Sequence, residues 1–379
     1  MIRRALGAGW AFFKSEVVLC AAILLAIVSA CFVPPSPAYL SYIDWNTLAL
    51  LFSLMAVMKG FQQEGVFEYL GSALLRRTGT TRAMMAVLVF LPFFCSMVIT
   101  NDVSLITFVP FAIAVLRLAR QESRAIFLIV LQTLAANLGS MFTPMGNPQN
   151  LYLYARSGMS FWELCWVMLP YVALSALCLA GLALVPKAQP IPRLEVNAQL
   201  GNRVHLIWYG CGFLLCLLGI FNLLPDLAIA AIVLVFLLFA NRPLLTKVDY
   251  SLLGTFVAFF VFIGNLSAIP SFQSFLISAL EGHVVPVSVL ASQVISNVPA
   301  ALLLSGFTQD WNGLLIGTNL GGLGTLIASM ASLISYKQLA KEYPEKRKSY
   351  FLQFTLYNVV MLALLLAEFW LLTQIHPQA

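Results

Sequence analysis

Long apolar runs alternate along the chain with short polar interruptions. Nine of the runs are long enough to cross a hydrocarbon core of roughly 30 Å as helices. They are residues 17–33, 43–59, 125–156, 161–186, 205–222, 226–240, 249–266, 312–336 and 350–373. Two further runs, 82–118 and 284–308, are apolar with a polar centre. Because the alternation typical of barrel strands is absent, the pattern predicts an all-α polytopic membrane protein with about 9 to 11 spans.

The polar centres interrupt their runs with amides and hydroxyls. In "VITNDVSLITFVP" (98–110) four polar residues stand together, Thr100, Asn101, Asp102 and Ser104. In the later run, Ser296 and Asn297 divide two arms of about 12 and 11 residues, or roughly 18 Å of helix each at 1.5 Å per residue. Neither arm can cross a bilayer, so 284–308 is predicted to be a re-entrant hairpin.

The run 82–118 leaves two alternatives open. Pseudo-symmetry with the later run predicts a second hairpin, which enters from the opposite side of the membrane. Its arms are longer, so two complete crossings are the alternative, and Pro92 and Pro110 would shorten or kink the straight portions. Both alternatives leave the orientation of the remaining spans unchanged.

Composition and charge agree with a membrane protein and orient it. Of 379 residues, 61% are hydrophobic and 9% are charged, whereas soluble domains have about 25% charged residues. If each polar-centred run enters and leaves the membrane by the same face, all of the Lys and Arg residues except Arg156 lie on one side of the membrane. The positive-inside rule makes that side cytoplasmic. We therefore expect a cell inner (plasma) membrane protein with a cytoplasmic N-terminus and an external C-terminus, and the net charge of +6 does not indicate nucleic-acid binding.

An internal repeat divides the chain into 1–204 and 205–379. Three blocks recur in the same order: "IDWNTLALLFSLMAVMKG" (43–60) with "VDYSLLGTFVAFFVFIGN" (248–265), "TNDVSLITFVP" (100–110) with "SNVPAALLLSG" (296–306), and "NLGSMFTPMGNPQNLY" (137–152) with "NLGGLGTLIASMASLI" (319–334). Five crossings separate the first span from its counterpart at 226–240. Since five is odd, the second half is predicted to be inverted, with hairpin 82–118 cytoplasmic and hairpin 284–308 external, as in many secondary transporters.

The third pair of blocks predicts two broken helices, at 125–156 and 312–336, because dense Gly and Pro unwind a helix. Hairpin tips and broken helices present backbone N–H groups to anions and carbonyls to cations. The predicted substrate and ion site comprises Thr100, Asn101, Asp102, Ser104, Asn137, Thr143, Gly146, Asn147, Ser296, Asn297, Thr318, Asn319, Gly321, Gly322 and Thr325. Asn101, Asp102 and Asn297 are candidate sodium ligands. Alternative roles are satisfaction of the turn backbone by the amides and close helix packing at the glycines.

The carboxylates divide into two groups. By this topology Asp102 is the carboxylate deep in the apolar region, where a counter-cation or a proton is expected, and its alternative role is an N-cap for the following helix. Asp44 and Asp249 are predicted to be N-caps of their spans. Glu368 is expected at the surface near the outer end of the last span.

These residues resemble the ion transporter superfamily, which includes divalent-anion/sodium symporters, citrate-transporter-like permeases, arsenite permeases and D-type sodium/proton antiporters. The resemblance covers about residues 17 to 373 and rests on "TND", "SNV", "TPMGNPQN" and "GTNLGGLGT". It implies a transport domain that moves against a scaffold that includes 43–78, and commonly a homodimer. The tips depart from the Ser-Asn-Thr of dicarboxylate symporters, and an Asn-Asp tip is more similar to the arsenite-permease and antiporter branch.

The expected function is secondary active transport of a small anion by alternating access, coupled to sodium or protons. The alternatives are a sodium/proton antiporter, an arsenite-type efflux permease and an ion channel. The chain lacks a GxxxxGK[ST] loop and a soluble domain, so ATP-driven pumping is not expected. As a carrier, the protein is not expected to be an enzyme. No cofactor is predicted beyond the coupling ion, and the partners expected are the small anionic or inorganic substrate, the lipid bilayer and a second copy of the chain.

Overall fold

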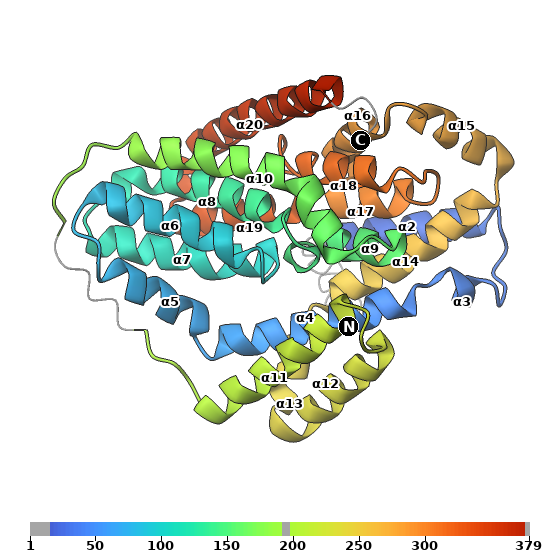
Figure 1. Cartoon of the computed structure of the whole chain (residues 1–379), viewed down its shortest axis with the longest axis horizontal. Helices are drawn as coiled ribbons and strands as arrows, with labels where there is room; N and C mark the ends of the chain where they lie inside the picture. The colour runs from blue at the N-terminus through green and yellow to red at the C-terminus, as the bar shows by residue number, and fades with distance from the viewer. Residues whose placement is uncertain (1–15, 192–197, 376–379) are drawn as a thin grey trace, which may run out of the picture.

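The computed structural model describes residues 16–191 and 198–375, and the regular structure of that part is helical (Figure 1). Six of its helices are long and apolar enough to cross a membrane, or seven if the bent pair α15 and α16 forms one span. The all-α polytopic prediction is confirmed. The predicted 9 to 11 spans also include helices that are too short to be among these six, such as α2 with 14 residues and α12 with 15.

The first half of the chain contains nine of the helices. They are α2 (Val17–Ala30), α3 (Tyr39–Tyr42), α4 (Trp45–Gln63), α5 (Val66–Leu75), α6 (Thr81–Cys95), α7 (Asn101–Leu118), α8 (Ala125–Ser140), α9 (Pro148–Ser157) and α10 (Phe161–Leu184). The segment between α8 and α9 contains a single 3-10 turn, Pro144–Gly146. The run 125–156 is therefore a broken helix.

The second half repeats this order after a connecting helix, α11 (Arg203–Ile220). It contains α12 (Asp226–Ala240), α13 (Arg242–Leu245), α14 (Tyr250–Ser267), α15 (Pro270–Leu280), α16 (Val284–Ile295), α17 (Asn297–Leu304), α18 (Trp311–Leu320), α19 (Met330–Glu342) and α20 (Arg347–Ile375). The break between α18 and α19 contains Gly324, whose φ of 99° favours glycine.

Equivalent side chains cap equivalent helices in the two halves. Asp44 accepts a hydrogen bond from the backbone N–H of Thr47 at 3.0 Å at the start of α4. Asp249 accepts one from Leu252 at 2.9 Å at the start of α14. Both carboxylates satisfy N–H groups that have no partner within the helix, so the two N-cap predictions are confirmed.

Helix packing is reciprocal between the halves. Helix α2 packs along α14, and its counterpart α12 packs along α4. Helix α6 packs on α8 as α16 packs on α18, while α7 contacts α19 and α17 contacts α9. Figure 1 shows α6, α7 and α8 toward one end of the molecule and α16, α17 and α18 on the other side of its centre. The two halves thus interlock at the centre of the bundle.

The run 82–118 forms two helices, and the second of them, α7, has 18 residues and is among the helices long and apolar enough to cross a membrane. The hairpin and the two full crossings therefore both stay predictions. The chain turns between α6 and α7 at residues 96–100, and Asn101 at this turn contacts the last part of α8. Because α8 is continued beyond its break by α9, the contact places the turn midway along a broken span. Pro92 and Pro110 both lie inside their helices.

Contacts of basic side chains join the end of α7 to the connection between α19 and α20, and we call this end of the bundle the basic face. There Arg117 pairs with Glu342 at 2.7 Å, and the ammonium of Lys346 lies 4.4 Å from the ring centre of Tyr343. Arg3, Arg4, Lys14 and Arg193, which also support the predicted orientation, lie outside the described residues, as does the C-terminal tail after Ile375.

Candidate substrate and ion site

Asn137, near the C-terminal end of α8, joins the two halves of the molecule. Its Oδ1 accepts hydrogen bonds from Nδ2 of Asn101 at 2.9 Å and from Oγ of Ser329 at 3.1 Å. Its Nδ2 donates to Oγ of Ser332 at 3.3 Å. One buried amide therefore connects the first hairpin tip, the first broken helix and the second broken helix.

The pseudo-symmetry of the two halves relates the contact between Asn137 and Ser332 to a second contact. Asn319, near the end of α18, donates from Nδ2 to Oδ1 of Asn150 in α9 at 2.7 Å. Asn319 follows Asn137 by the same number of residues as Ser332 follows Asn150. The Asn137 to Ser332 and Asn319 to Asn150 contacts are thus equivalent, and each joins the end of one broken helix to the start of the other.

The two tip asparagines also behave alike. Oδ1 of Asn101 accepts from the backbone N–H of Asp102 at 2.9 Å, and Oδ1 of Asn297 accepts from that of Val298 at 3.0 Å. Asn297 further donates its own N–H to the carbonyl of Ala328 at 2.9 Å. The expected turn-satisfying role of these amides is therefore present. The amide nitrogen of Asn101 faces the centre, where it meets Asn137.

Amide side chains satisfy the carbonyls released by each helix break. Nδ2 of Asn150 lies 3.2 to 3.3 Å from the carbonyls of Ser140, Met141 and Thr143. Nε2 of Gln293 donates to the carbonyls of Gly321 and Leu323 at 2.8 and 2.9 Å. An unsatisfied carbonyl in a bilayer costs several kcal/mol. The carbonyls expected to meet cations are thus already engaged with protein amides.

Two predicted glycines lie where backbone segments approach closely. A Cβ on Gly146 would collide with the carbonyl oxygen of Ser140 and would lie 2.7 Å from that of Ser96. A Cβ on Gly322 would lie 3.0 Å from Nδ2 of Asn297 and 3.2 Å from the carbonyl oxygen of Asn319. Both glycines therefore admit neighbours that a side chain would displace.

Asp102 lies in the first turn of α7 and is half-buried. The partial positive charge of the helix N-terminus offsets part of the cost of burying its carboxylate. The N-cap of α7 is Thr100, which accepts from the backbone N–H of Val103 at 3.4 Å. The alternative role of Asp102 as the N-cap is therefore wrong. No salt bridge within the described ranges involves its carboxylate.

The remaining predicted residues do not all face the centre. Thr143 bonds the carbonyl of Met97 at the first hairpin, and Asn147 is buried beside it in the break. Ser104 donates to Pro92 at 3.3 Å, and Thr318 donates to Leu314 within its own helix at 2.7 Å. Thr325 is exposed.

Several central residues escaped the sequence analysis. Asn150, Ser329 and Ser332 already lie within the aligned blocks 137–152 and 319–334, so the repeat could have identified them. Gln149 lies in the same block but was not singled out. It is fully buried, and neither its Oε1 nor its Nε2 has a hydrogen-bond partner among the described residues. Both polar atoms of this amide are therefore free to bond a ligand.

Glu368 also departs from expectation. Its Oε2 is buried in the described part of the protein without a hydrogen-bond partner, and the residue is half-buried. The prediction of a surface position is wrong, because helix α20 turns this side chain toward its neighbours. Asp102 is therefore not the only carboxylate with buried surroundings in the apolar region.

Three hydrogen-bonded polar side chains link the first hairpin to α4, between the centre and the basic face. Nζ of Lys59 donates to Oε1 of Gln62 at 2.8 Å, and Nε2 of Gln62 donates to Oγ1 of Thr107 at 2.8 Å. Thr107 lies little more than one turn beyond Asp102 on α7. The bridge holds α4 and α7 together on this side of the centre.

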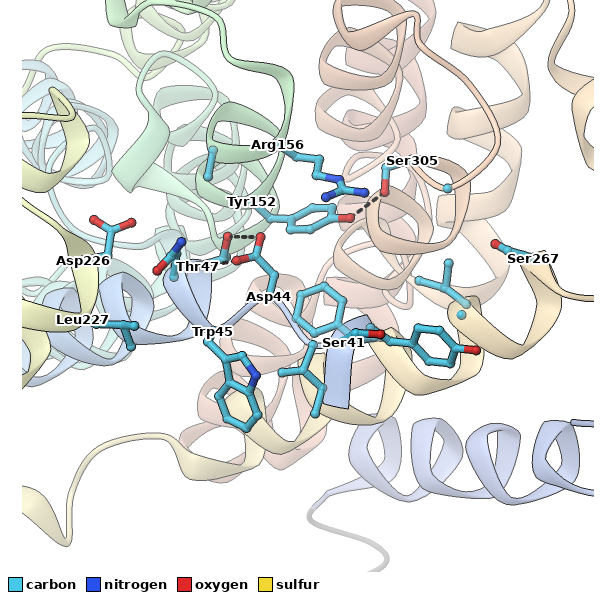
Figure 2. A pocket seen from close by; sticks show the side chains of 18 of the residues that line it. Ser41, Asp44, Trp45, Thr47, Tyr152, Arg156, Asp226, Leu227, Ser267 and Ser305 are labelled. Carbon is cyan, nitrogen blue, oxygen red and sulfur yellow. Dashed lines mark hydrogen bonds between the residues drawn. The ribbon is translucent and has the colours of Figure 1, made fainter. Parts of the chain in front are cut away.

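At the opposite end of α4, where that helix begins, lies a cavity of about 880 Å³, which we call the vestibule. It is lined by the starts of α4 and α12, by α14, by α9 and by the end of α17 (Figure 2). Tyr152 and Ser305, both in its wall, share a 2.8 Å hydrogen bond that connects the first half of the chain to the second. Among the described residues, no three or more His, Cys, Asp or Glu side chains gather in a way that could hold a metal ion.

Two interlocked halves, two hairpin tips and two amide-satisfied helix breaks define the chain as a polytopic membrane transporter. The family model described as "Citrate transporter" (CitMHS) matches residues 8–309. The chain therefore belongs to the citrate transporter family.

Curated relatives agree with this class. The chain is 33% identical over 321 residues to the inner membrane protein YbiR of Escherichia coli, with 83% of this chain and 86% of the relative covered. It is 32% identical over 296 residues to the uncharacterized transporter MJ0456 of Methanocaldococcus jannaschii, with 78% and 81% covered. A shorter match, 36% over 135 residues, joins it to the silicon efflux transporter LSI3 of Oryza sativa, with 35% and 27% covered.

Proposed function

We propose that the protein is a secondary active transporter that moves a small anion across the cell inner membrane by alternating access, coupled to sodium or protons. The observation that carries the proposal is the pair of equivalent contacts, Asn137 with Ser332 and Asn319 with Asn150. Each half contributes a tip and a break to one centre, which is the arrangement that secondary transporters use for substrate and coupling ion. Membership of the citrate transporter family supports an anionic substrate.

The two ends of the molecule support alternating access. At the end toward the basic face, the Lys59, Gln62 and Thr107 chain joins α4 to the first hairpin. At the other end, the vestibule separates the start of α4 from α9 and α17. A molecule that is bridged on one side of its centre and hollowed on the other corresponds to one of the two states of a carrier. We assign the basic face to the cytoplasm and the vestibule to the outside.

The coupling role falls to Asp102. Its carboxylate lies at the tip of a hairpin in the apolar region, where sodium or a proton would neutralise it. A scaffold that includes residues 43–78, in a homodimer, would let the hairpins and broken helices move as a unit. These assignments follow from the proposed carrier mechanism.

A second candidate is an efflux permease or sodium/proton antiporter. The Asn101 and Asp102 tip favours it, and so does the partial match to a protein named as a silicon efflux transporter. An ion channel is the third candidate, and it is disfavoured by the buried, hydrogen-bonded centre.

Counterflow in proteoliposomes separates these candidates. Purified protein is reconstituted and loaded with unlabelled citrate, succinate, sulfate, phosphate or arsenite, and entry of the same labelled compound is followed with imposed sodium or proton gradients. A carrier of anions exchanges citrate, succinate, sulfate or phosphate and accumulates it when a cation gradient is applied. Exchange of arsenite alone would establish the arsenite-type permease. Exchange of sodium for protons without any panel compound would establish the antiporter, and current without counterflow would establish the channel.

A further inference from the structure

The vestibule is built from polar side chains of both halves. Asp44 and Trp45 come from the start of α4, Asp226 from the start of α12, Arg156 from the end of α9 and Ser305 from the end of α17 (Figure 2). Among all the residues that line it, Arg156 is the one basic side chain. The topology prediction separately leaves Arg156 as the exception to the charge asymmetry.

Arg156 offers donors that no protein group uses. Its side chain is exposed, and no hydrogen bond or salt bridge of the described residues includes it. A guanidinium presents five N–H groups in a planar fork that matches the oxygens of a carboxylate, sulfate or phosphate. The vestibule therefore contains a free recognition group for an oxyanion.

The neighbouring carboxylates differ in how they are engaged. Asp44 uses both oxygens locally, one for the backbone N–H of Thr47 at 3.0 Å and the other for its hydroxyl at 2.7 Å. Asp226 lies in the first turn of α12, where the helix N-terminus offsets its charge. Asp44 is thus engaged by its own helix, whereas the guanidinium of Arg156 has hydrogen-bonding capacity available to a ligand.

Helix α9 leads from the vestibule to the central site. Gln149, Tyr152 and Arg156 are spaced three and then four residues apart, so they lie on one face of the helix. Between the exposed Arg156 and the fully buried, unpartnered Gln149 stands Tyr152, whose hydroxyl bonds Ser305. Its ring packs against Phe260 of α14 at a centroid distance of 5.7 Å. Tyr152 therefore lies between Arg156 and Gln149 along this face of α9.

We propose that the vestibule is the access site for an oxyanion substrate. The guanidinium of Arg156 captures the anion there, the Tyr152 to Ser305 hydrogen bond closes the passage beneath it, and the amide of Gln149 receives the anion when that bond opens. This assignment rests on the proposed function, because it names the residues through which the transported anion enters.

Quenching of Trp45 fluorescence tests the capture step without a known substrate. Trp45 lines the vestibule and is 50% exposed. Iodide, caesium and acrylamide serve as quenchers at low ionic strength. The quenching of Trp45 itself is the difference in quenching between each protein and its Trp45→Phe counterpart. Arg156→Gln should lower iodide quenching and raise caesium quenching by roughly twofold, because a positive charge raises the local concentration of an anion and lowers that of a cation. Acrylamide quenching should be unchanged.

Two matched variants fix the sign of the effect. Asp226→Asn removes the opposite charge from the same wall and should raise iodide quenching, while Arg156→Lys should retain the wild-type value. The proposal is overturned if Arg156→Gln leaves the ratio of iodide to caesium quenching unchanged, or if Asp226→Asn shifts that ratio in the same direction.

Transport from each side tests the access role. With the panel anion that the wild-type protein exchanges fastest, Arg156→Gln should raise KM about tenfold from the vestibule side and leave KM from the basic face unchanged. Equal changes on both sides, or none, would refute the access role. If the wild-type protein exchanges no panel anion, the proposed function fails, whereas the quenching result still decides whether Arg156 attracts anions into the vestibule.

Discussion

Asn319 at the end of α18 donates a 2.7 Å hydrogen bond to Asn150 at the start of α9, and thereby joins the two broken helices directly. The same Asn150 amide donates toward the carbonyls released by the first break. One side chain therefore completes a break in its own half and anchors it to the other half.

Replacing Asn150 should weaken the whole bundle. Asn150→Ala leaves the carbonyls of the first break and one Asn319 N–H without partners, at a cost of about 1–3 kcal/mol for each unsatisfied buried group. We expect the melting temperature in detergent to fall by roughly 5 °C or more. Asn46→Ala, at an exposed position on α4, is the control and should melt as the wild type does. Equal melting of the two variants would contradict the structural role of Asn150.

Bulk at Gly322 should stop transport without preventing folding. In Gly322→Leu the side chain must displace Nδ2 of Asn297 or the carbonyl of Asn319, which lie 3.0 and 3.2 Å from its Cβ position. Counterflow should fall below roughly a tenth of the wild-type rate, since the backbone can no longer approach a ligand there. Gly181→Leu on α10 is the matched control, because a Cβ at Gly181 meets nothing within 4 Å. Wild-type counterflow by Gly322→Leu would remove this glycine from the site.

Asp102 should set the dependence on the coupling ion. Asp102→Asn keeps the size of the side chain and removes the charge that sodium or a proton neutralises. We expect exchange of the anion to persist while accumulation driven by a cation gradient is lost. Asp310→Asn makes the same change at the exposed N-cap of α18 and should leave accumulation unchanged. Full gradient-driven accumulation by Asp102→Asn, with the same ion dependence, would show that another group couples the cycle.

Ser296 at the second hairpin tip holds a conformation that favours glycine, with φ of 73°. Ser296→Gly relieves this strain, and Ser296→Ala retains it, while both remove the hydroxyl that lies 3.4 Å from the carbonyl of Ala328. Thermal denaturation should find the Gly variant more stable than the Ala variant by about 1 kcal/mol. The reverse order would mean that the tip relaxes when the hydroxyl is lost.

The orientation of the chain is open to direct measurement. Reporters fused after Arg77, Arg120, Pro192 and Lys346 should be cytoplasmic, and a reporter after His376 should be external. The positive-inside rule predicts this arrangement from the distribution of Lys and Arg. A cytoplasmic C-terminus would be incompatible with inversion of the second half.

Local patterns in the sequence determined most of the helices. Apolar runs of sufficient length predicted the spans, and Asp44 and Asp249 predicted their caps, because a span and an N-cap depend on residues that are neighbours in the chain. Dense Gly and Pro likewise located both breaks. Repetition of the blocks indicated that Asn101 and Asn137 act with Asn297 and Asn319.

Tertiary structure alone decided which polar groups meet. Gln293 satisfies carbonyls of a helix break 28 and 30 residues away, and Asn137 contacts Ser332 from the other half of the chain. Tyr152 likewise forms a hydrogen bond with Ser305 of the other half, in the wall of the vestibule. Such partners follow from how separate helices pack, since a buried polar group binds whichever donor or acceptor the packing brings within about 3 Å. Periodicity can place a residue on a helix face, but the position of the facing helix determines its partner.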